Sequence, residues 1–250
     1  MNLQIMPTSL EMARAAAAYA AGFLKEAISR QGHASFIVAT GTSKIEFLAG
    51  LTSTPGIDWS KTVLFHLDEY IGLPGNHPAS FRRYLKEHII DCVHPGTVHL
   101  IRGEAPDLQA EIQRLNELMV DNTVDVAFVG IGENGHLAFN DPPADFETEE
   151  PYLLVELDEA CRRQQLGEGW FASLDEVPRR AISMSIRQIL KSGAIVCTVP
   201  DRRKAQAVRV CLTRDISPLH PASALLKHSN VHLFLDQAAA SLLKTGTRIS

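Results

Sequence analysis

The chain lacks the segments that carry a protein into or across a membrane. Its N-terminus has no basic leader followed by an apolar core, so we expect no signal peptide. The most apolar run there, residues 15–24, is bracketed by Arg14 and Lys25 and is shorter than the about 20 residues that span a bilayer. The 4 cysteines show no CxxC spacing, which predicts reduced, mostly packed thiols. These absences predict a cytoplasmic protein with no membrane partner.

The chain also lacks the patterns of several binding classes. A formal net charge of -5, with no helix-turn-helix pattern and no basic extension, gives no reason to expect a nucleic-acid partner. His136 has no partner in an HExxH or HxxxH pattern, so the sequence predicts no metal site. A small phosphate remains a suitable ligand for an acidic chain, because it needs only local cations.

The composition is that of an ordinary globular enzyme. The 250 residues are 45% apolar and 21% charged, which is enough for a sizeable core. No repeat, low-complexity tract or flexible linker interrupts them. We therefore expect a single domain over residues 1–250, since about 100–200 residues per domain is the usual guide.

Short apolar runs alternate with amphipathic helical stretches along the chain. The expected strands are residues 35–40, 62–67, 97–101, 125–131, 181–186, 194–199 and 231–236. The expected helices are residues 9–30, capped by Thr8 or Ser9, and 43–51, 78–90, 107–120, 187–191, 201–213 and 237–244. This alternation predicts an α/β fold, with a doubly wound and mostly parallel sheet and helices on both faces, in a Rossmann-like three-layer arrangement.

Two stretches of the chain show no regular helix or strand pattern. We interpret residues 140–152 as an active-site loop and residues 164–178 as a candidate lid. In open α/β sheets, ligands bind beyond the carboxyl ends of the strands, near a switch in strand order. The residues at those ends are therefore the candidates for function.

The first expected strand runs into Thr40, Gly41, Thr42 and Ser43, where the chain turns into a helix. Glycine permits close backbone approach, and free N–H groups and hydroxyls at a helix start can hold an anion. The stretch is not a GxxxxGK[ST] nucleotide loop. It is either a phosphate-binding loop or only a helix cap after a turn.

The second expected strand ends in adjacent carboxylates, Asp68 and Glu69. On an extended chain neighbouring side chains point to opposite faces, so only one is expected to reach a given ligand. His66 would share a face with Asp68, and we interpret it as a packed histidine rather than a ligand. The alternative for the carboxylates is a cap or a solvated corner.

The fourth expected strand leads into Gly130, Gly132 and Gly135, followed by His136. The glycines let the backbone turn sharply and lie close to a bound molecule. His136 can act as an acid or base near neutral pH if a neighbour fixes its tautomer, and the nearest candidates are Asn134 and Asp141. The alternative is a glycine-rich turn whose histidine bonds only to backbone.

The sixth expected strand is followed by Arg202, Arg203 and Lys204 in the first turn of a helix. Cations there oppose the helix dipole, which is easier to understand if an anion binds among them. For two of the three, solvated surface charge is the simpler interpretation.

With these motifs, the sequence resembles the glucosamine-6-phosphate deaminase/isomerase family. The matching stretches lie in order between residues 36 and 236: ATGTS, HLDEYIGLPGNHPASF, GIGENGHLAFNDP, RRKAQAV and SPLHPASAL. The 6-phosphogluconolactonases, a sister family, share the G-x-G-x-x-G-H turn but lack the DEYxGLP and AFN[DE]P elements.

The resemblance implies conversion of glucosamine 6-phosphate to fructose 6-phosphate and ammonia, without a metal or organic cofactor. It implies that Asp68 moves a proton between C2 and C1, and that His136 assists ring opening. It places Asp141 as the carboxylate that orients the histidine. Thr40 to Ser43 and Lys204 would bind the phosphate of the small-molecule substrate.

Three departures from the family pattern stand out. Asn134 replaces the usual aspartate two residues before the histidine, Asp141 replaces the usual glutamate, and Thr42 replaces the second loop glycine. An amide can hold a histidine but cannot stabilise an imidazolium as a carboxylate would. The family's phosphate-binding arginine has no clear match, and Arg162 and Arg163 are the candidates.

Two other functions stay open at this point. One is hydrolysis of a sugar-phosphate lactone, which needs a base for water but no carrier for the C2 proton. The other is a non-catalytic sugar-phosphate sensor, which is disfavoured because the expected fold fills the chain with no DNA-binding element. A homo-oligomer is compatible with the sequence.

Overall fold

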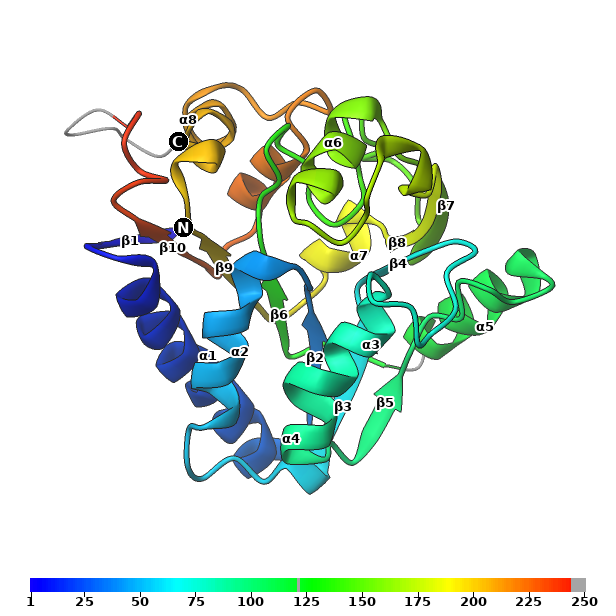
Figure 1. Cartoon of the computed structure of the whole chain (residues 1–250). Helices are drawn as coiled ribbons and strands as arrows, with labels where there is room; N and C mark the ends of the chain where they lie inside the picture. The colour runs from blue at the N-terminus through cyan, green and yellow to red at the C-terminus, as the bar shows by residue number, and fades with distance from the viewer. Residues whose placement is uncertain (121, 244–250) are drawn as a thin grey trace.

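In the computed structural model, residues 1–120 and 122–243 are described, and they build a parallel sheet with helices on both faces (Figure 1). Seven strands form this sheet, and every neighbouring pair is parallel. In spatial order they are β1 (Asn2–Met6), β10 (Val231–Asp236), β9 (Ala194–Val199), β6 (Val126–Val129), β2 (Ala34–Val38), β3 (Thr62–His66) and β5 (Thr97–His99). The predicted α/β fold is thus confirmed.

A second, antiparallel sheet of three strands stands beside the carboxyl ends of the first. Its strands, in spatial order, are β4 (Asp68–Tyr70), β8 (Arg180–Met184) and β7 (Tyr152–Glu156). We expected residues 181–186 as a strand of one main sheet, and this was wrong, because they pair with β4 and β7 instead. The sequence analysis did not predict β4 or β7 of this sheet, nor β1 of the large sheet.

Two helical layers cover the faces of the large sheet. One contains α1 (Ser9–Gln31), α2 (Ile45–Thr52), α3 (Phe81–Leu85), the π-helical turn Lys86–Ile90 and α4 (Asp91–Val93). The other contains α5 (Leu108–Val120), α7 (Ile186–Leu190), α8 (Ala205–Thr213) and the 3-10 segment Pro221–Lys227. The remaining helix, α6 (Glu159–Gly167), lies over the small antiparallel sheet. Short 3-10 turns span Thr42–Lys44, Trp59–Lys61, Leu174–Glu176 and Arg202–Lys204.

Local sequence explains why these elements form. α1 begins where Thr8 accepts a hydrogen bond from the Glu11 N–H, and it ends at Gly32, whose φ is 84°. Its many alanines keep the inner face flat against the sheet. β2, β6, β9 and β10 are buried on both faces, which is why each reads as a continuous apolar run.

Two predictions, one of a helix and one of an irregular lid, need correction. Residues 237–243 form turns rather than the expected helix, and Lys244 lies outside the described residues. The expected irregular lid, residues 164–178, begins inside α6 and is irregular only beyond it. Among the described residues, no helix has the length and apolar character needed to cross a membrane.

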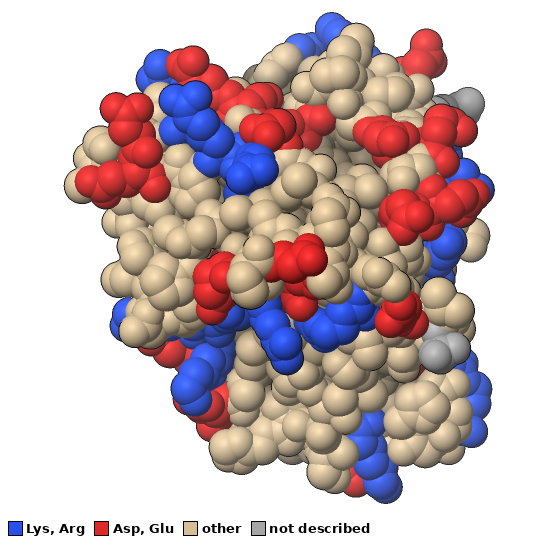
Figure 2. Space-filling view, turned by 90° about the vertical axis from the view of Figure 1, so that its right-hand side faces the viewer, with Lys and Arg blue, Asp and Glu red and all other residues tan. Residues whose placement is uncertain are grey.

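Charge is mixed on the face that lies to the right in Figure 1. Figure 2 shows basic side chains there bordered by acidic ones. Basic and acidic side chains also pair directly on the protein surface. Arg187 lies 2.6 Å from Glu149, and Lys86 lies 2.6 Å from Asp91. This face therefore offers no unbroken basic surface.

Strand order places the switch point between β2 and β6. From β2 the chain adds β3 and β5 on one side, and then returns to the other side of β2 for β6, β9 and β10. At such a point the segments that follow the strands diverge and leave a crevice. The Gly41 turn after β2 and the Gly130 turn after β6 lie there.

Hydrogen bonds to backbone carbonyl groups join the regions of the two sheets. The Met184 N–H donates to Leu67 O at 2.9 Å, and Tyr152 Oη donates to His66 O at 2.7 Å. The Gly72 N–H donates to Gly103 O at 2.9 Å. A side chain at position 103 would begin with a Cβ only 2.0 Å from Tyr70 O, so glycine is required there.

We expect Gly103→Ala to lower the free energy of unfolding by about 1–3 kcal/mol, the usual effect of overpacking. The measurement is urea denaturation monitored by circular dichroism. Gly22→Ala is the matched control, because Gly22 is exposed on α1 and its added Cβ would meet nothing within 4 Å. The control should gain about 0.5–1 kcal/mol. Equal stability of Gly103→Ala and the parent would contradict the contact.

Candidate active site

The carboxyl ends of β2, β3, β6 and β9 meet around a cavity of about 70 Å³. Among its lining residues are most of those singled out from the sequence: Thr40, Gly41, Ser43, Asp68, His136 and Lys204. A larger hollow of about 920 Å³ lies between α5 and β7, and it shares no residue with this group. The small cavity is therefore the candidate active site.

Of the adjacent carboxylates Asp68 and Glu69, Asp68 reaches the cavity. It begins β4, immediately after the chain leaves the large sheet, and its side chain is buried. Its Oδ1 has no hydrogen-bond partner among the described residues. Burial, and then the neighbouring Glu69 carboxylate, raise the pKa of Asp68 to about 8. An unpartnered buried carboxyl with such a pKa is suited to accept a proton.

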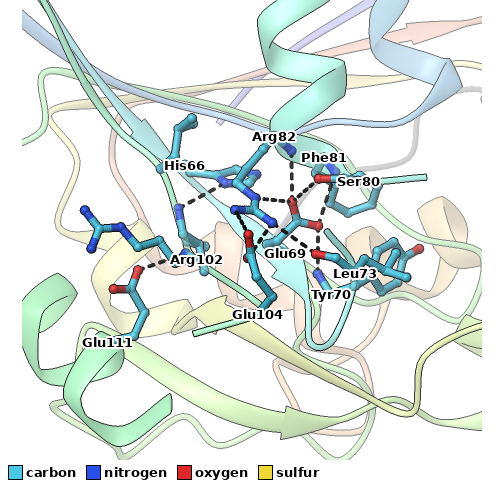
Figure 3. A network of polar contacts seen from close by, with 12 residues as sticks. His66, Glu69, Tyr70, Leu73, Ser80, Phe81, Arg82, Arg102, Glu104 and Glu111 are labelled. Atoms are coloured by element: carbon cyan, nitrogen blue, oxygen red, sulfur yellow. Dashed lines mark hydrogen bonds and ion pairs between the residues drawn. The ribbon is translucent and has the colours of Figure 1, made fainter. Parts of the chain in front are cut away.

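Glu69 points the other way, into the network of Figure 3. Its carboxylate accepts from four donors: Tyr70 N at 2.9 Å, Ser80 Oγ at 2.8 Å, Phe81 N at 3.2 Å and Arg82 N at 2.9 Å. Burial raises the pKa of Glu69, and these hydrogen bonds oppose the rise. The opposite orientations of Asp68 and Glu69 confirm the expectation from an extended chain, and Glu69 serves to anchor the start of α3.

The same network includes Arg82, Glu104 and His66. The Arg82 guanidinium lies 3.4 Å from Glu69 and 2.6 Å from Glu104. His66 is fully buried, and its Nδ1 accepts from Ile101 N at 3.4 Å. Burial and then Arg82 lower the pKa of His66 to about 3, so the ring is neutral. This agrees with the interpretation of His66 as a packed histidine.

His136 faces the cavity and Asp141 lies behind it. Their Nδ1 and Oδ1 atoms are 3.2 Å apart, with both side chains nearly buried. Asp141 also accepts from Asp158 N at 2.9 Å. Burial opposes ionisation of Asp141, but hydrogen bonds from His136 and Asn134 outweigh it and lower its pKa. A carboxylate on Nδ1 leaves Nε2 for the cavity, where the ring lies over Gly132 so closely that a Cβ there would be 2.2 Å away.

Asn134 acts on Asp141 and on the backbone rather than on the histidine ring. Its Nδ2 donates to Asp141 at 3.0 Å and to Asp158 at 3.2 Å, and its Oδ1 accepts from His136 N at 3.0 Å. Of the two candidates for fixing the ring, Asp141 therefore contacts it directly. Asn134 keeps two carboxylates apart by donating to both.

Cys161 is a neighbour that sequence reasoning missed. One ligand atom each of His136, Asp141 and Cys161 lie within 4.8 Å of one another, as a metal site would require. Burial, and then Asp141 and Asp158, raise the pKa of the Cys161 thiol. A metal ligand must be the thiolate, which this environment disfavours. We therefore interpret the cluster as the close His136–Asp141 contact packed against a protonated thiol.

The loop after β2 has the geometry of an anion site. Gly41 adopts φ 103° and ψ 163°, a conformation that only glycine takes readily, and its carbonyl accepts from Tyr84 Oη at 2.9 Å. The 3-10 turn Thr42–Lys44 follows and leads into α2. Thr40, Gly41 and Ser43 line the cavity, whereas Thr42 contributes its backbone N–H.

Two lysines lie at this end of the sheet. Lys204 is buried, and its Nζ is 3.9 Å from Glu133. Burial lowers the pKa of Lys204, and the Glu133 and Glu168 carboxylates oppose this. Lys44, which no sequence motif singled out, donates to Val129 O at 2.7 Å and to Thr198 O at 2.8 Å. It thus ties β6 to β9 below the cavity.

The nearby arginines do not line the cavity. Arg202 is exposed, and Arg203 pairs with Asp201 at 2.9 Å. The two arginines proposed for phosphate lie outside the cavity lining. Arg162 donates to Val177 O at 3.0 Å, and exposed Arg163 pairs with Glu159 at 2.5 Å. Two other α6 residues, Gln164 and Gln165, reach the cavity instead, and so does Glu168, which follows the helix.

This geometry agrees with the comparison to known families. The family model described as Glucosamine-6-phosphate isomerases/6-phosphogluconolactonase matches residues 7–234. The chain belongs to this family. A glucosamine-6-phosphate deaminase of Lactobacillus delbrueckii subsp. bulgaricus is 36% identical over 216 residues, which cover 86% of this chain and 89% of the relative.

Solved structures give the same assignment of the fold. A monomeric glucosamine-6-phosphate deaminase superposes with a TM-score of 0.88 at 32% identity, covering 97% of this chain and 100% of that one. A 6-phosphogluconolactonase from Shewanella baltica superposes with a TM-score of 0.78 at 20% identity, covering 94% and 97%. The second likeness shows the shared fold alone.

We expect Asn134→Asp to reduce stability in a pH-dependent way. The new carboxylate would replace the donor between Asp141 and Asp158, and losing hydrogen bonds to charged groups costs about 1.5–3 kcal/mol. Repulsion raises the carboxyl pKa values in the folded state, so stability is retained below about pH 4 and lost as pH rises. The measurement is the thermal midpoint from pH 4 to 8. Asn134→Ala, which loses the same donor without adding charge, should lack this pH dependence; parallel curves would contradict the assignment.

Proposed function

We propose that this protein converts glucosamine 6-phosphate to fructose 6-phosphate and ammonia. The observation that carries the proposal is that Asp68 and His136, with Asp141 behind the histidine, meet at one small cavity beside the Gly41 loop. Relatives at 34–36% identity with this activity in their names support it. The substrate is then an amino-sugar phosphate.

His136 would act first, on the ring form of the sugar. With Nδ1 against Asp141, Nε2 can give its proton to the ring oxygen and take up the proton of the C1 hydroxyl, which opens the ring to the aldehyde. Asp141 stabilises the charge on the imidazole during this transfer. Asn134, by holding Asp141, acts as a positioning residue.

Asp68 would then move the proton that interconverts aldose and ketose. It removes the proton from C2 of the open chain to give an enolamine, and returns it to C1, which leaves an imine at C2. Water adds to that imine and ammonia departs, giving the ketone of fructose 6-phosphate. A carboxylate in a closed, water-poor pocket suits such proton abstraction next to a carbonyl group.

The phosphate would bind at the loop after β2. Ser43 and Lys204 line the cavity, and the neighbouring Thr42 N–H donates to Glu168, which also lines it. Donors at the start of a helix, together with a buried cation, are the usual means of holding a phosphate. The chemistry needs no metal or organic cofactor in this scheme.

We also propose that residues 1–250 act as one domain and that the enzyme works in the cytoplasm. The 4 cysteines are free, and Cys161, Cys197 and Cys211 are buried, as expected in a reducing compartment. All the proposed site residues come from one chain, so a homo-oligomer is compatible with the scheme but is not needed to complete the site.

The decisive experiment is incubation with glucosamine 6-phosphate, following ammonia and fructose 6-phosphate together. The proposal expects the two products in equal amounts. A second arm uses 6-phosphogluconolactone. Hydrolysis of the lactone with no ammonia from the amino sugar would replace the proposal with the lactonase function, and binding of both without turnover would replace it with a sensor.

We expect Asp68→Asn to lower kcat by on the order of 10²–10⁴ with little change in KM, because a base acts mainly in the transition state.

For the parent, kcat/KM should rise with pH up to about 8, the raised pKa of Asp68. That raised pKa also means that folded-state stability falls as pH rises from about 4 to 8. The variant should therefore be more stable than the parent at pH 9. Near-parental turnover would exclude Asp68 from the proton transfer.

We expect Lys204→Ala to weaken phosphate binding rather than chemistry. One charged hydrogen bond is worth about 1.5–3 kcal/mol in kcat/KM, mostly through KM. Arg202→Ala is the matched control, because Arg202 lies in the same 3-10 turn but is exposed and does not line the cavity. Kinetics on glucosamine 6-phosphate and on glucosamine check the assignment. An equal loss on the unphosphorylated sugar would show that Lys204 does not bind phosphate.

A further inference from the structure

A carboxylate of the chain itself occupies the anion-binding loop. Glu168 follows α6, and its Oε2 accepts from the Thr42 N–H at 3.3 Å. The same oxygen lies 3.4 Å from the position that a Cβ on Gly41 would take. The glycine turn and the first free N–H of the helical segment thus hold Glu168 in the way that such a site holds a phosphate oxygen.

The cations that a phosphate would need also respond to Glu168. Burial lowers the pKa of Lys204, and the charges of Glu133 and Glu168 oppose this lowering. The hydrogen bond to Asp201 is the main cause that raises the pKa of Arg203, and Glu133 and Glu168 add to it. Arg203 lies 2.9 Å from Asp201 and 3.4 Å from Glu133, and Lys204 lies 3.9 Å from Glu133, so carboxylates already neighbour both cations. A phosphate that entered while these carboxylates stayed in place would meet little net positive charge.

Gln164 holds Glu168 in this position. Its Nε2 donates to Glu168 Oε1 at 3.3 Å, and its Oε1 accepts from Glu133 N at 2.8 Å. The amide thus links the end of α6 to the glycine turn after β6. With these contacts the cavity measures only about 70 Å³. Sites for small molecules usually measure about 300–1,000 Å³, so a sugar phosphate requires the end of α6 to move.

We propose that Glu168 is a specificity-determining residue that competes with the substrate's phosphate for the Gly41–Thr42 loop. A phosphate must displace the carboxylate from Thr42 N, and only a ligand with a strongly bound phosphate does so. Release of Glu168 frees the end of α6 and enlarges the cavity for the sugar. This inference rests on the proposed function for the identity of the sugar, but its test is a binding measurement.

Trp170, two residues beyond Glu168, provides the signal for that test. The chain has 2 tryptophans, and the other, Trp59, packs against Phe36 under the opposite end of the sheet. In a Trp59→Phe background the fluorescence therefore reports Trp170 alone. The probes are inorganic phosphate and glucosamine 6-phosphate, titrated separately at constant ionic strength.

We expect Glu168→Gln to bind inorganic phosphate about tenfold more tightly than the parent, because the competing charge and its hydrogen bond are lost. Glu159→Gln is the matched control, since Glu159 is an exposed glutamate of the same helix that pairs with Arg163. It should bind as the parent does. Adding Lys204→Ala to Glu168→Gln should cancel the gain, which places the bound phosphate in this cavity.

Unchanged or weaker phosphate binding by Glu168→Gln would overturn the inference, and so would an equal gain in Glu159→Gln. Glu168→Ala, measured alongside, shows whether the amide of the Gln variant simply takes the place of the carboxylate. If the parent releases no ammonia from glucosamine 6-phosphate but Glu168→Gln gains phosphate affinity, the proposed function fails while this inference stands.

Discussion

The site depends on one buried interaction, the capture of Glu69 by the start of α3. Three backbone N–H groups and the Ser80 hydroxyl bond to a single carboxylate, and the Arg82 guanidinium lies 3.4 Å away. This fixes β4 where the chain leaves the large sheet. Because neighbouring side chains of a strand point apart, Asp68 must then face the cavity. Burial, and then the nearby charge of Glu69, raise the pKa of Asp68. Glu69 therefore fixes the position of Asp68 and adds to its proton affinity.

The second constraint is charge balance at the other end of the cavity. Lys44 is satisfied by backbone carbonyls and by Thr198, so it stabilises the meeting of β6 and β9 without being free for a ligand. Lys204 and Arg203 face carboxylates from the glycine turn and from the end of α6. A buried cation without an anion would be costly, so these acidic residues stabilise Lys204 in its buried position.

The two sheets divide the work of the site. The parallel sheet supplies the anion loop after β2, the glycine turn after β6 and the cationic turn after β9. The antiparallel sheet supplies Asp68 and supports α6, which covers the cavity. A separate apolar cluster that includes Tyr70, Phe139 and Phe171 holds this second layer together. Substrate entry can therefore move α6 and its extension while the parallel sheet stays in place.

Most of the parallel layer follows from the sequence alone, because its central strands are continuous apolar runs and several of its helices carry regular stripes; the edge strand β1 was missed. The sequence also puts Asp68, His136, Lys204 and the loop from Thr40 to Ser43 at strand ends, where glycines and local charge indicate a ligand site. The second sheet could not be predicted, since β4 and β7 are short and their pairing is set by distant backbone partners. Likewise Glu168, Cys161 and Lys44 carry no local pattern, and their importance comes from contacts with residues far along the chain.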